Sequence, residues 1–373
     1  MYNHHYLKPK KTTSAQVIWH ICRLLFGFSF VVSGFVKAVD PLGLQYKIED
    51  YLIALNLTEL SPLALTAAFI LCSVEFVIGL NFVFSIRMRE SSFVGLLFMS
   101  IMTPLTLWIA IADPVTDCGC FGDAIILSNW ATFWKNIVLL TAVIIVVVLR
   151  KKVRDTWLSP FPSWTLTVTF FIIPMALGFY ALRFLPIIDF RPYKIGNNII
   201  ELMTIPEDAP KGESKTTLIY EKDGVEKEFT LQNYPANDTS WHFVDQKTVQ
   251  IKEGYVPPIH DFAIIDNNND DITTDILYYP DTTYLVVMYD LTLTRLTGLE
   301  SLVKLHQYAT EKGQPFYVLT ASGETEREQF SNATNTTFNF CSVDPITLKT
   351  IIRANPGVVV LKEGTILNKY AVY

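Results

Sequence analysis

Two cysteines separated by a single glycine are the residues of this sequence best suited to chemistry. They lie in the segment Asp117-Cys118-Gly119-Cys120-Phe121-Gly122-Asp123, between two long apolar runs. Thiols at this spacing can form a disulfide in a small ring, and strain makes such a bond easier to exchange. The intervening glycine permits backbone angles that other residues resist. The pair therefore suits thiol–disulfide exchange, while an inert structural disulfide is the alternative interpretation.

The other sulfur and nitrogen ligands do not complete a metal site. A structural zinc ion takes four nitrogen or sulfur ligands, and His242, His260 and His306 are far from the cysteine pair in sequence. Cys22 and Cys72 lie within apolar runs and are expected to pack as small apolar residues. We therefore predict no metal site.

The overall composition indicates a membrane protein with a sizeable soluble part. Half of the 373 residues are hydrophobic, only 18% are charged, and the mean hydropathy is +0.29. Soluble domains carry about 25% charged residues, so the composition excludes an ordinary cytosolic enzyme. The net charge of −6 provides no basic surface for nucleic acid. Five cysteines are too few for a disulfide scaffold.

Five apolar runs are long enough to cross a bilayer, because about 20 residues span its hydrocarbon core. The first run is too long for a signal peptide and no clear cleavage site follows it, so we interpret it as a retained anchor. The five runs are Val17–Val36, Leu63–Ile86, Phe93–Ala112, Ala131–Leu149 and Trp164–Leu185.

The positive residues predict the orientation of these spans. They gather in the N-terminal tail and in the second and fourth connections, which share one side of a five-span protein. The positive-inside rule places that side in the cytoplasm. The cysteine pair and everything after Leu185 are then extracytoplasmic. The residues concerned are Lys8, Lys10, Lys11, Arg87, Arg89, Arg150, Lys151, Lys152 and Arg154.

Charged residues also lie inside or at the ends of the apolar runs, among them Glu75, Lys37 and Arg23. A carboxylate at the position of Glu75 costs roughly 2.5–3.5 kcal/mol on insertion scales, so it is expected to be paired, protonated or functional. Lys37, at the outer end of the first run, is its candidate partner. Glu75 should face the bundle interior, either as a structural residue or as a proton carrier. Arg23 lies towards the cytoplasmic end, where it is expected to snorkel to the interface.

From Pro186 onward the chain has the pattern of soluble domains. Thr216–Tyr220 and Lys227–Leu231 are predicted strands joined at Asp223-Gly224, a strong hairpin signal. Further on, strand-like and helix-like stretches alternate, which predicts an α/β or mixed sheet. The predicted strands are Tyr284–Tyr289, Pro315–Thr320, Phe338–Cys341 and Val358–Leu361, and the predicted helices are Leu299–Glu311 and Pro345–Arg353.

The cysteine segment and the first two spans resemble a known membrane family. The Cys-Gly-Cys-Phe-Gly motif is similar to that of the MauE branch of the DoxX-like proteins. Arg23, Gly27, Ser33-Gly34, Lys37 and Asp40-Pro41, with Glu75 and Gly79, resemble the DoxX pattern. The resemblance covers residues 15–150.

This resemblance implies a four-span helical bundle in a bacterial inner membrane that helps to form or maintain disulfides in exported partners. Cys118 and Cys120 would then be catalytic, with Gly119, Asp123, Glu75, Lys37 and Arg23 in support. Four-span thiol oxidoreductases linked to quinone are a looser analogy. The chain departs from them by lacking a Cys-x-x-Cys pair and by carrying a fifth span. No cofactor is evident, and a quinone has only weak support.

The end of the chain resembles a thioredoxin-like domain. The segment from Ala354 to Thr365 is similar to the part in which a cis proline precedes a strand, a glycine turn and a final strand. The resemblance assigns the cis proline to Pro356, with a trans proline as the alternative. The place of the usual Cys-x-x-Cys pair is taken by Asp290–Arg295, which contains no sulfur. Cys341 is expected to pack in the core, although exchange with Cys118 or Cys120 is an alternative.

These observations predict a membrane α-helical bundle of five spans followed by an extracytoplasmic α/β domain. The expected units are a cytoplasmic tail (1–16), a DoxX-like four-span domain (17–150), the fifth span and its flanks (151–188), a small strand-rich unit (189–258) and a thioredoxin-like domain (259–373). The expected function is thiol–disulfide chemistry or maturation of exported proteins. A non-enzymatic scaffold of a cell-envelope assembly, with exported or envelope proteins as partners, is the alternative. A transporter is a weaker one, and the oligomeric state is not predicted.

Overall fold

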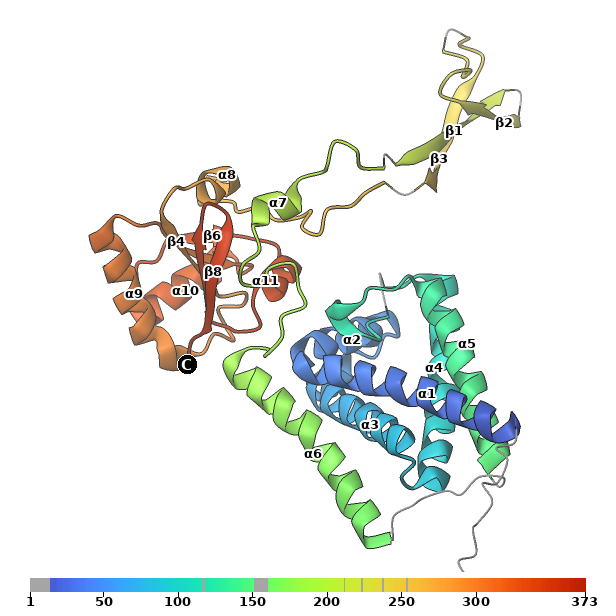
Figure 1. The fold of residues 1–373 in the computed structure, drawn as a ribbon. Coiled ribbons are helices and arrows are strands. Elements are labelled where there is room, and N and C mark those ends of the chain that lie inside the picture. The colour runs from blue at the N-terminus through green and yellow to red at the C-terminus, as the bar shows by residue number, and fades with distance from the viewer. Residues whose placement is uncertain are drawn as a thin grey trace, which may run out of the picture.

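Long helices make up most of the first half of the molecule (Figure 1). The computed structural model describes residues 14–115, 118–150, 160–210, 212–222, 224–236, 238–252 and 254–373. Within these ranges, five segments are long and apolar enough to cross a membrane, which confirms the five predicted spans. The helices are α1 (Ser14–Val39), α3 (Ala64–Phe84), α4 (Met88–Ala112), α5 (Asn129–Leu149) and α6 (Pro160–Phe184).

A shorter helix, α2 (Pro41–Ala54), and a 3-10 turn, η1 (Thr58–Leu63), connect α1 to α3. Asp40 caps α2, because its carboxylate accepts a hydrogen bond of 3.0 Å from the amide of Gly43. Pro41 follows at the first helical position, where its missing N–H is not needed. Asp40 is therefore the single residue between the end of α1 and the start of α2.

Small residues let α1 and α3 approach closely. A Cβ atom at Gly34 on α1 would lie 2.6 Å from the amide nitrogen of Phe76 on α3. A Cβ atom at Gly79 on α3 would lie 2.5 Å from the amide nitrogen of Val31 on α1. Backbone-to-backbone contact of this kind is how helices associate in a bilayer.

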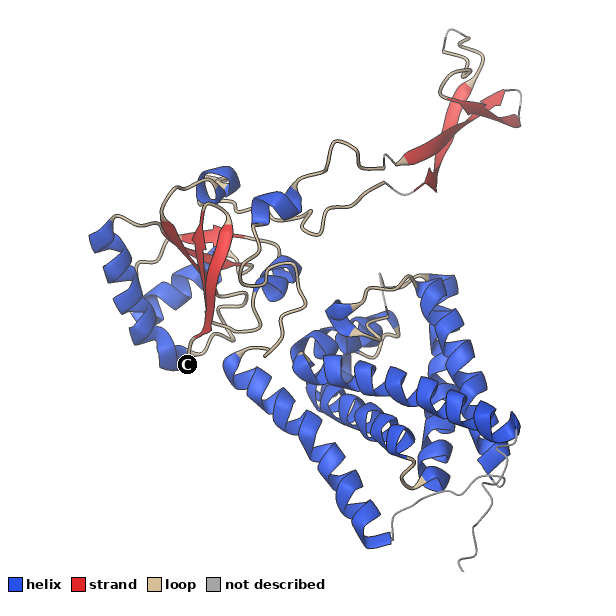
Figure 2. Ribbon diagram, viewed as in Figure 1, coloured by secondary structure: helices blue, strands red, loops and turns tan. Residues whose placement is uncertain are grey.

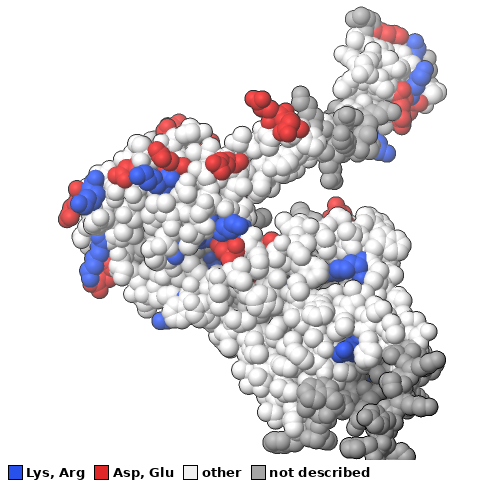
Figure 3. All heavy atoms as spheres, viewed as in Figure 1, with Lys and Arg blue, Asp and Glu red and all other residues white. Residues whose placement is uncertain are grey.

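The outer surface of the bundle is apolar, as a lipid-facing surface should be. Ile111 is 70% exposed and Val148 is 67% exposed. Figure 3 shows very few charged side chains on the visible face of the bundle, whereas the C-terminal part of the molecule carries both signs. The interior of the bundle contains a cluster formed by Trp19, Phe26, Phe30, Ile78, Phe82, Met88, Met99, Leu139, Val143 and Val146.

The two ends of the bundle differ in charge. The start of α4 and the end of α5 lie together, since a guanidinium nitrogen of Arg150 donates to the carbonyl of Arg89 at 3.4 Å. Arg87 lies at the same end. The other positive residues used to predict the orientation, Lys8, Lys10, Lys11, Lys151, Lys152 and Arg154, lie outside the described residues. The opposite end carries α2, the cysteine segment and the connection to the C-terminal part.

A three-stranded antiparallel sheet projects away from the rest of the molecule (Figure 1). It consists of β1 (Glu213–Lys222), β2 (Val225–Thr230) and β3 (His242–Lys252), in the order β2-β1-β3. The pairing of β1 with β2 confirms the hairpin predicted at Gly224, which adopts φ +78°. Asp223 lies outside the described residues.

The remaining residues form an α/β lobe around a five-stranded sheet, coloured red beside blue helices in Figure 2. Its strands are β4 (Thr282–Val287), β5 (Phe316–Thr320), β6 (Phe340–Ser342), β7 (Gly357–Lys362) and β8 (Thr365–Ala371), in the order β6-β5-β4-β7-β8. β4, β5 and β6 run parallel, while β7 pairs antiparallel with both β4 and β8. This mixed sheet agrees with the predicted strand and helix order.

Strand β4 is buried on both faces of the lobe sheet, because helices cover both faces. Leu285 and Val287 contact one core, while Val286 and the following Met288 contact the other. The first core is closed by α7 (Ile199–Met203), α8 (Thr273–Leu277) and α11 (Pro345–Ile351). The second is closed by α9 (Leu299–Lys312) and α10 (Glu324–Thr334).

The segment that follows α6 belongs to the lobe rather than to the strand-rich unit. The sequence grouped residues 189–258 together, but Tyr193 and Ile199 pack in the first core of the lobe. Asn198 also forms an isolated bridge with Thr365 on β8. Tyr193 and Ile199 pack in one core with strands that come more than 150 residues later in the chain. Such contacts leave no pattern in the local sequence, so the composition of the segment could not show that it belongs to the lobe.

Candidate functional site

The cysteine pair lies in a tight loop between α4 and α5. Gly119 adopts φ +62°, and the amide of Gly122 donates to the carbonyl of Gly119 at 3.1 Å. At the base of the loop, the Asn129 side chain donates to Asp113 at 2.8 Å and to the carbonyl of Val115 at 3.1 Å. Residues 116–117, and thus Asp117 of the sequence motif, lie outside the described residues. The loop is therefore closed around the two cysteines by its own backbone and by the first turn of α5.

Both cysteines of the loop are free thiols, and they are not equivalent. Cys118 is 9% exposed, whereas Cys120 is half-buried. A hydrogen bond from the Cys118 thiol to Cys120 lowers the pKa of Cys120 to about 6, even though burial opposes this. The same hydrogen bond, followed by burial, raises the pKa of Cys118. The pair thus consists of one sulfur suited to be a thiolate and one that keeps its proton.

Two lysines add to the stabilisation of a thiolate at Cys120. Lys135 on α5 and Lys37 on α1 each lower its pKa through their positive charge. The ammonium group of Lys135 also lies 4.4 Å from the ring centroid of Phe121, the residue next to Cys120. An electropositive, partly exposed environment of this kind is typical of reactive cysteines.

Lys37 belongs to a buried polar chain that leads from α3 to the cysteine loop. Its Nζ atom lies 2.7 Å from Oε1 of Glu75, and both side chains are 4% exposed, which confirms the predicted partnership. Ser33 Oγ lies 2.8 Å from Oε2 of Glu75 and 2.6 Å from the carbonyl oxygen of Cys120. Because the hydroxyl has one proton, it can donate to only one of these acceptors at a time.

A small cavity of about 30 Å³ lies next to this chain. It has room for one or two water molecules. It is lined by residues of α1, α3, α4, α5 and the cysteine loop, including Ser33, Lys37, Glu75, Cys120 and Lys135. The structure therefore brings the sequence-predicted residues Lys37, Glu75 and Cys120 together around one polar space.

Helix α2, to which the sequence analysis gave no role, holds the other side of the loop. The hydroxyl of Tyr51 donates to the carbonyl of Cys118 at 2.7 Å. A Cβ atom at Gly119 would lie 3.0 Å from Cγ of Lys47, so the loop fits directly against this helix. Tyr51 and Lys47 are four residues apart, which places them on one face of a helix. That spacing is the only sequence signal that could have indicated them.

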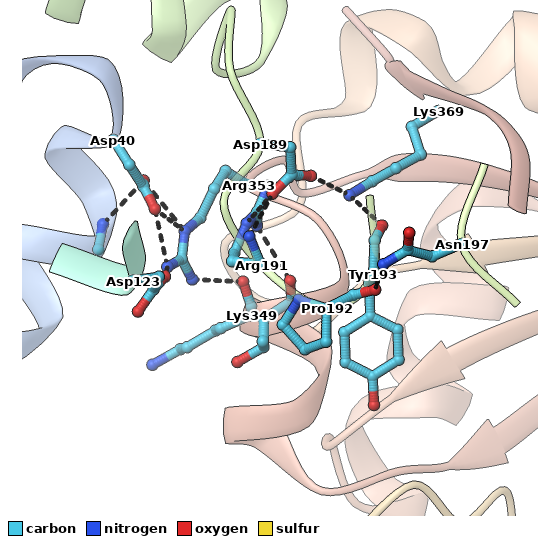
Figure 4. A network of polar contacts seen from close by, with 12 residues as sticks. Asp40, Asp123, Asp189, Arg191, Pro192, Tyr193, Asn197, Lys349, Arg353 and Lys369 are labelled. Carbon is cyan, nitrogen blue, oxygen red and sulfur yellow. Dashed lines mark hydrogen bonds and ion pairs between the residues drawn. The ribbon is translucent and has the colours of Figure 1, made fainter. Parts of the chain in front are cut away.

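An arginine of the C-terminal lobe reaches the same end of the bundle, as Figure 4 shows. Nε of Arg353 donates to Oδ2 of Asp40 at 2.9 Å, and its Nη2 lies 2.9 Å from the same oxygen. Nη2 also donates to Oδ2 of Asp123 at 3.2 Å. Burial acts to raise the pKa of Asp40, but the charges of Arg353 and Arg191 hold it below its usual value. Asp123, predicted to support the cysteine pair, therefore forms an ion pair with Arg353 between the bundle and the lobe.

A second ion-pair group ties the segment after α6 to the lobe (Figure 4). Arg191 donates to Asp189 at 2.7 and 2.9 Å and to the carbonyl of Thr350 at 3.0 Å. Lys369 on β8 donates to Asp189 at 2.7 Å and to the carbonyl of Tyr193 at 3.0 Å. The lobe is therefore held both to its own connecting segment and to the bundle.

The remaining predicted residues lie away from the cysteine pair. Arg23 does not snorkel: it is buried and donates to the carbonyls of Phe82 and Val83 in the last turn of α3. Cys341 is fully buried in the first core of the lobe, and burial raises its pKa to about 11. The Asn355–Pro356 peptide bond is cis.

Cys22 and Cys72 lie within the bundle, at positions that suit packing. Cys72 is fully buried, and its thiol donates to the carbonyl of Phe69 at 3.2 Å. Cys22 packs against the main cluster of the bundle interior.

The cysteine loop lies in a part of the chain that matches the model of a known protein family. Residues 214–253, which cover the projecting sheet except for the first residue of β1, match a domain of unknown function (DUF8463). No curated protein and no solved structure matches the chain. Residues 15–149, from α1 to the end of α5, match the model of methylamine utilisation protein MauE. The helical bundle and its cysteine loop are therefore similar to this family, which supports a membrane protein of the MauE type.

Proposed function

We propose that this protein exchanges disulfides with exported proteins, with Cys120 as the attacking thiolate and Cys118 as the resolving thiol. The proposal rests on the difference between the two cysteine thiols, whose pKa values are shifted in opposite directions. One lies within reach of Lys135 and Lys37 and accepts a hydrogen bond, while the other donates that bond and keeps its proton. A thiolate beside a protonated partner is the arrangement that exchange requires.

The exchange proceeds in two steps that conserve atoms and charge. The Cys120 thiolate attacks one sulfur of a partner disulfide, forms a mixed disulfide and expels the other partner sulfur as a thiolate. Cys118 gives its proton to that thiolate and attacks Cys120, which releases the second partner sulfur. Two electrons pass to the partner, which is reduced, and a Cys118–Cys120 disulfide forms. The same steps in reverse oxidise a partner dithiol.

The proposed location is a bacterial inner membrane, with the N-terminus in the cytoplasm and the lobe on the extracytoplasmic side. The contacts of Arg353 with Asp40 and Asp123 support one part of this, because the lobe and the cysteine loop share one end of the bundle. Arg87, Arg89 and Arg150 gather at the other end, as the positive-inside rule requires of the cytoplasmic side.

We further propose that the lobe is a thioredoxin-like domain that holds the partner without exchanging disulfides itself. Its sheet order, its parallel β4 and β5 and its antiparallel β7 and β8 support this. The loop after β4 that would carry a Cys-x-x-Cys pair contacts the proline loop, since Asn355 donates to the carbonyl of Asp290 at 2.7 Å.

An open groove between the bundle and the lobe offers a place for the partner chain. It is lined on one side by α2, through Tyr46 and Glu49, and on the other by lobe residues that include Tyr289, Asp290 and Lys349. Tyr46 and Glu49 lie on the face of α2 next to the face that contacts the cysteine loop. A polypeptide in this groove would contact α2, the helix whose Tyr51 and Lys47 also contact the cysteine loop.

Trapping of mixed disulfides in intact cells tests the proposal. Cys118→Ser removes the resolving thiol, so partners should accumulate on Cys120 and appear as reducible adducts of higher mass. Cys120→Ser is the matched control and should accumulate none. Equal adducts in both variants, or none in either, would exclude the proposed roles. A pair that stays fully oxidised or fully reduced in growing cells would instead favour the scaffold interpretation.

A further inference from the structure

Arg353 is a lobe residue whose side chain contacts the helical bundle. Its side chain is 6% exposed, and it lies between α11 and Pro356. The guanidinium group leaves the lobe and contacts two carboxylates, those of Asp40 and Asp123, which come from different connections of the bundle. A planar group with several donors can hold two carboxylates at once, which a lysine ammonium does less well.

Asp40 connects this arginine to one support of the cysteine loop. It caps α2 through the amide of Gly43. The same helix carries Tyr51, which donates to the carbonyl of Cys118, and Lys47, which contacts Gly119. A displacement of the start of α2 would therefore move the groups that contact the backbone of Cys118 and Gly119.

Asp123 connects the arginine to the loop itself. It lies in the 3-10 turn η2 (Gly122–Ala124), which is separated from Cys120 by Phe121 alone. The amide of Ala124 donates to the carbonyl of Phe121 at 3.3 Å, and that of Gly122 donates to the carbonyl of Gly119. These consecutive turns fix the backbone of Cys120, so an anchor on Asp123 fixes it as well.

We infer that Arg353 is a positioning residue through which the C-terminal lobe holds the cysteine pair in its reactive arrangement. The inference rests on the proposed function, because it assigns a means of regulating the same site. A partner that draws the lobe away from the bundle would release Arg353 from Asp40 and Asp123. The loop would then lose the arrangement in which the Cys118 thiol and Lys135 stabilise the Cys120 thiolate.

The charged side chains that act on Cys120 are Lys135 on α5, Lys37 on α1 and Glu75 on α3. Two more charged side chains lie beside the loop. Lys47 on α2 contacts Gly119, and Asp123 follows the cysteine pair and contacts Arg353. Substitution of Arg353 leaves all of these side chains in the protein, so any change in the titration of Cys120 reports their arrangement or the lost charge.

The test is the pH dependence of Cys120 alkylation in the full-length protein in detergent, measured with iodoacetamide and peptide mass spectrometry. In Arg353→Gln the midpoint should rise by about one pH unit relative to the unmodified protein. An unchanged midpoint would overturn the inference. Thermal unfolding of each variant verifies that the chain is folded.

Two further variants separate positioning from charge. Asp123→Asn removes an anion near Cys120, so electrostatics alone would lower the midpoint, whereas loss of positioning raises it. Arg353→Lys keeps the charge but not the two-carboxylate contact, so positioning predicts a rise here as well. A lower midpoint in the first variant together with no change in the second would show that Arg353 acts only through its charge, and would overturn the inference.

Arg191→Gln is the matched control. Arg191 is also buried and close to Asp40, but it donates to Asp189 and Thr350 rather than to the bundle. Its loss should leave the Cys120 midpoint unchanged, and an equal rise would argue against a specific role of Arg353. If Cys120 of the unmodified protein shows no acidic midpoint at all, the proposed function fails. If the unmodified protein does show an acidic midpoint and Arg353→Gln shows the same midpoint, only this inference fails.

Discussion

Lys37 on α1 and Glu75 on α3 form a two-pronged salt bridge inside the helical bundle, with Nζ 2.7 Å from Oε1 and 2.9 Å from Oε2. This contact joins the two helices that pack most closely through Gly34 and Gly79. Ser33 Oγ lies within hydrogen-bond distance of both Glu75 and the carbonyl oxygen of Cys120, to one of which it can donate at a time. The charged residues predicted within the spans therefore serve both the packing of the bundle and the surroundings of the cysteine pair.

Removal of one partner of this salt bridge should destabilise the bundle strongly. Lys37→Met leaves the Glu75 carboxylate buried without compensation, which costs about 3–5 kcal/mol in the free energy of unfolding. The double variant Lys37→Met, Glu75→Leu removes both charges and should lose less than the single variant. Thermal unfolding in detergent measures the difference. Equal losses in the single and double variants would show that the pair contributes through packing rather than charge.

The charge of Lys135 should control the titration of Cys120. The pKa of Cys120 is lowered to about 6 by the Cys118 hydrogen bond and then by Lys135 and Lys37, so the thiolate forms above that pH. In Lys135→Met the midpoint of alkylation should rise by about one pH unit. Lys304→Met is the control, since Lys304 is exposed on α9 and pairs with Glu300. A midpoint that stays constant or falls in Lys135→Met would contradict the assignment.

Close packing of α1 on α3 should make Gly79 intolerant of a side chain. A Cβ atom there lies 2.5 Å from the backbone nitrogen of Val31, which cannot rotate away, so Gly79→Ala should cost about 1–3 kcal/mol. Gly178→Ala on α6 is the matched control. Its Cβ atom would lie 2.5 Å from a ring carbon of Phe69, a side chain that can turn, so its loss should be smaller. Thermal unfolding compares the two, and equal losses would refute the explanation.

Because of Lys369, the free energy of unfolding of the lobe should increase as the pH becomes alkaline. Burial and the nearby Arg191 lower the pKa of Lys369 from 10.5 to about 8, although Asp189 acts to raise it. Between these values the unfolded chain binds a proton that the folded lobe does not, so the free energy of unfolding increases with pH.

In Lys369→Met this increase, which amounts to about 3 kcal/mol, should disappear. Calorimetry of the full-length protein below, within and above the pH window measures it. Lys362→Met on β7 is the control, because Lys362 is exposed on a neighbouring strand. Persistence of the full increase in Lys369→Met would assign it to another group.

The sequence alone determined the features that depend on local patterns. Run length located all five spanning helices, because crossing the hydrocarbon core requires about 20 apolar residues. Alternation of strand-like and helix-like stretches located β4, β5 and β7, and the turn at Gly224 located the hairpin of β1 and β2. The pairing of Glu75 with Lys37 could also be inferred, because a buried carboxylate in a membrane needs a partner.

Only the tertiary structure decided which distant residues meet at the cysteine pair. Arg353 is separated from Asp40 by 313 positions, and nothing in its neighbourhood distinguishes it from a surface arginine. Arg23 looked like an interface residue, but it is buried and donates to two backbone carbonyls at the end of α3. The roles of Tyr51 and Lys47 depend on how α2 lies over the loop. Such contacts are set by packing between elements, which the order of residues within one element does not encode.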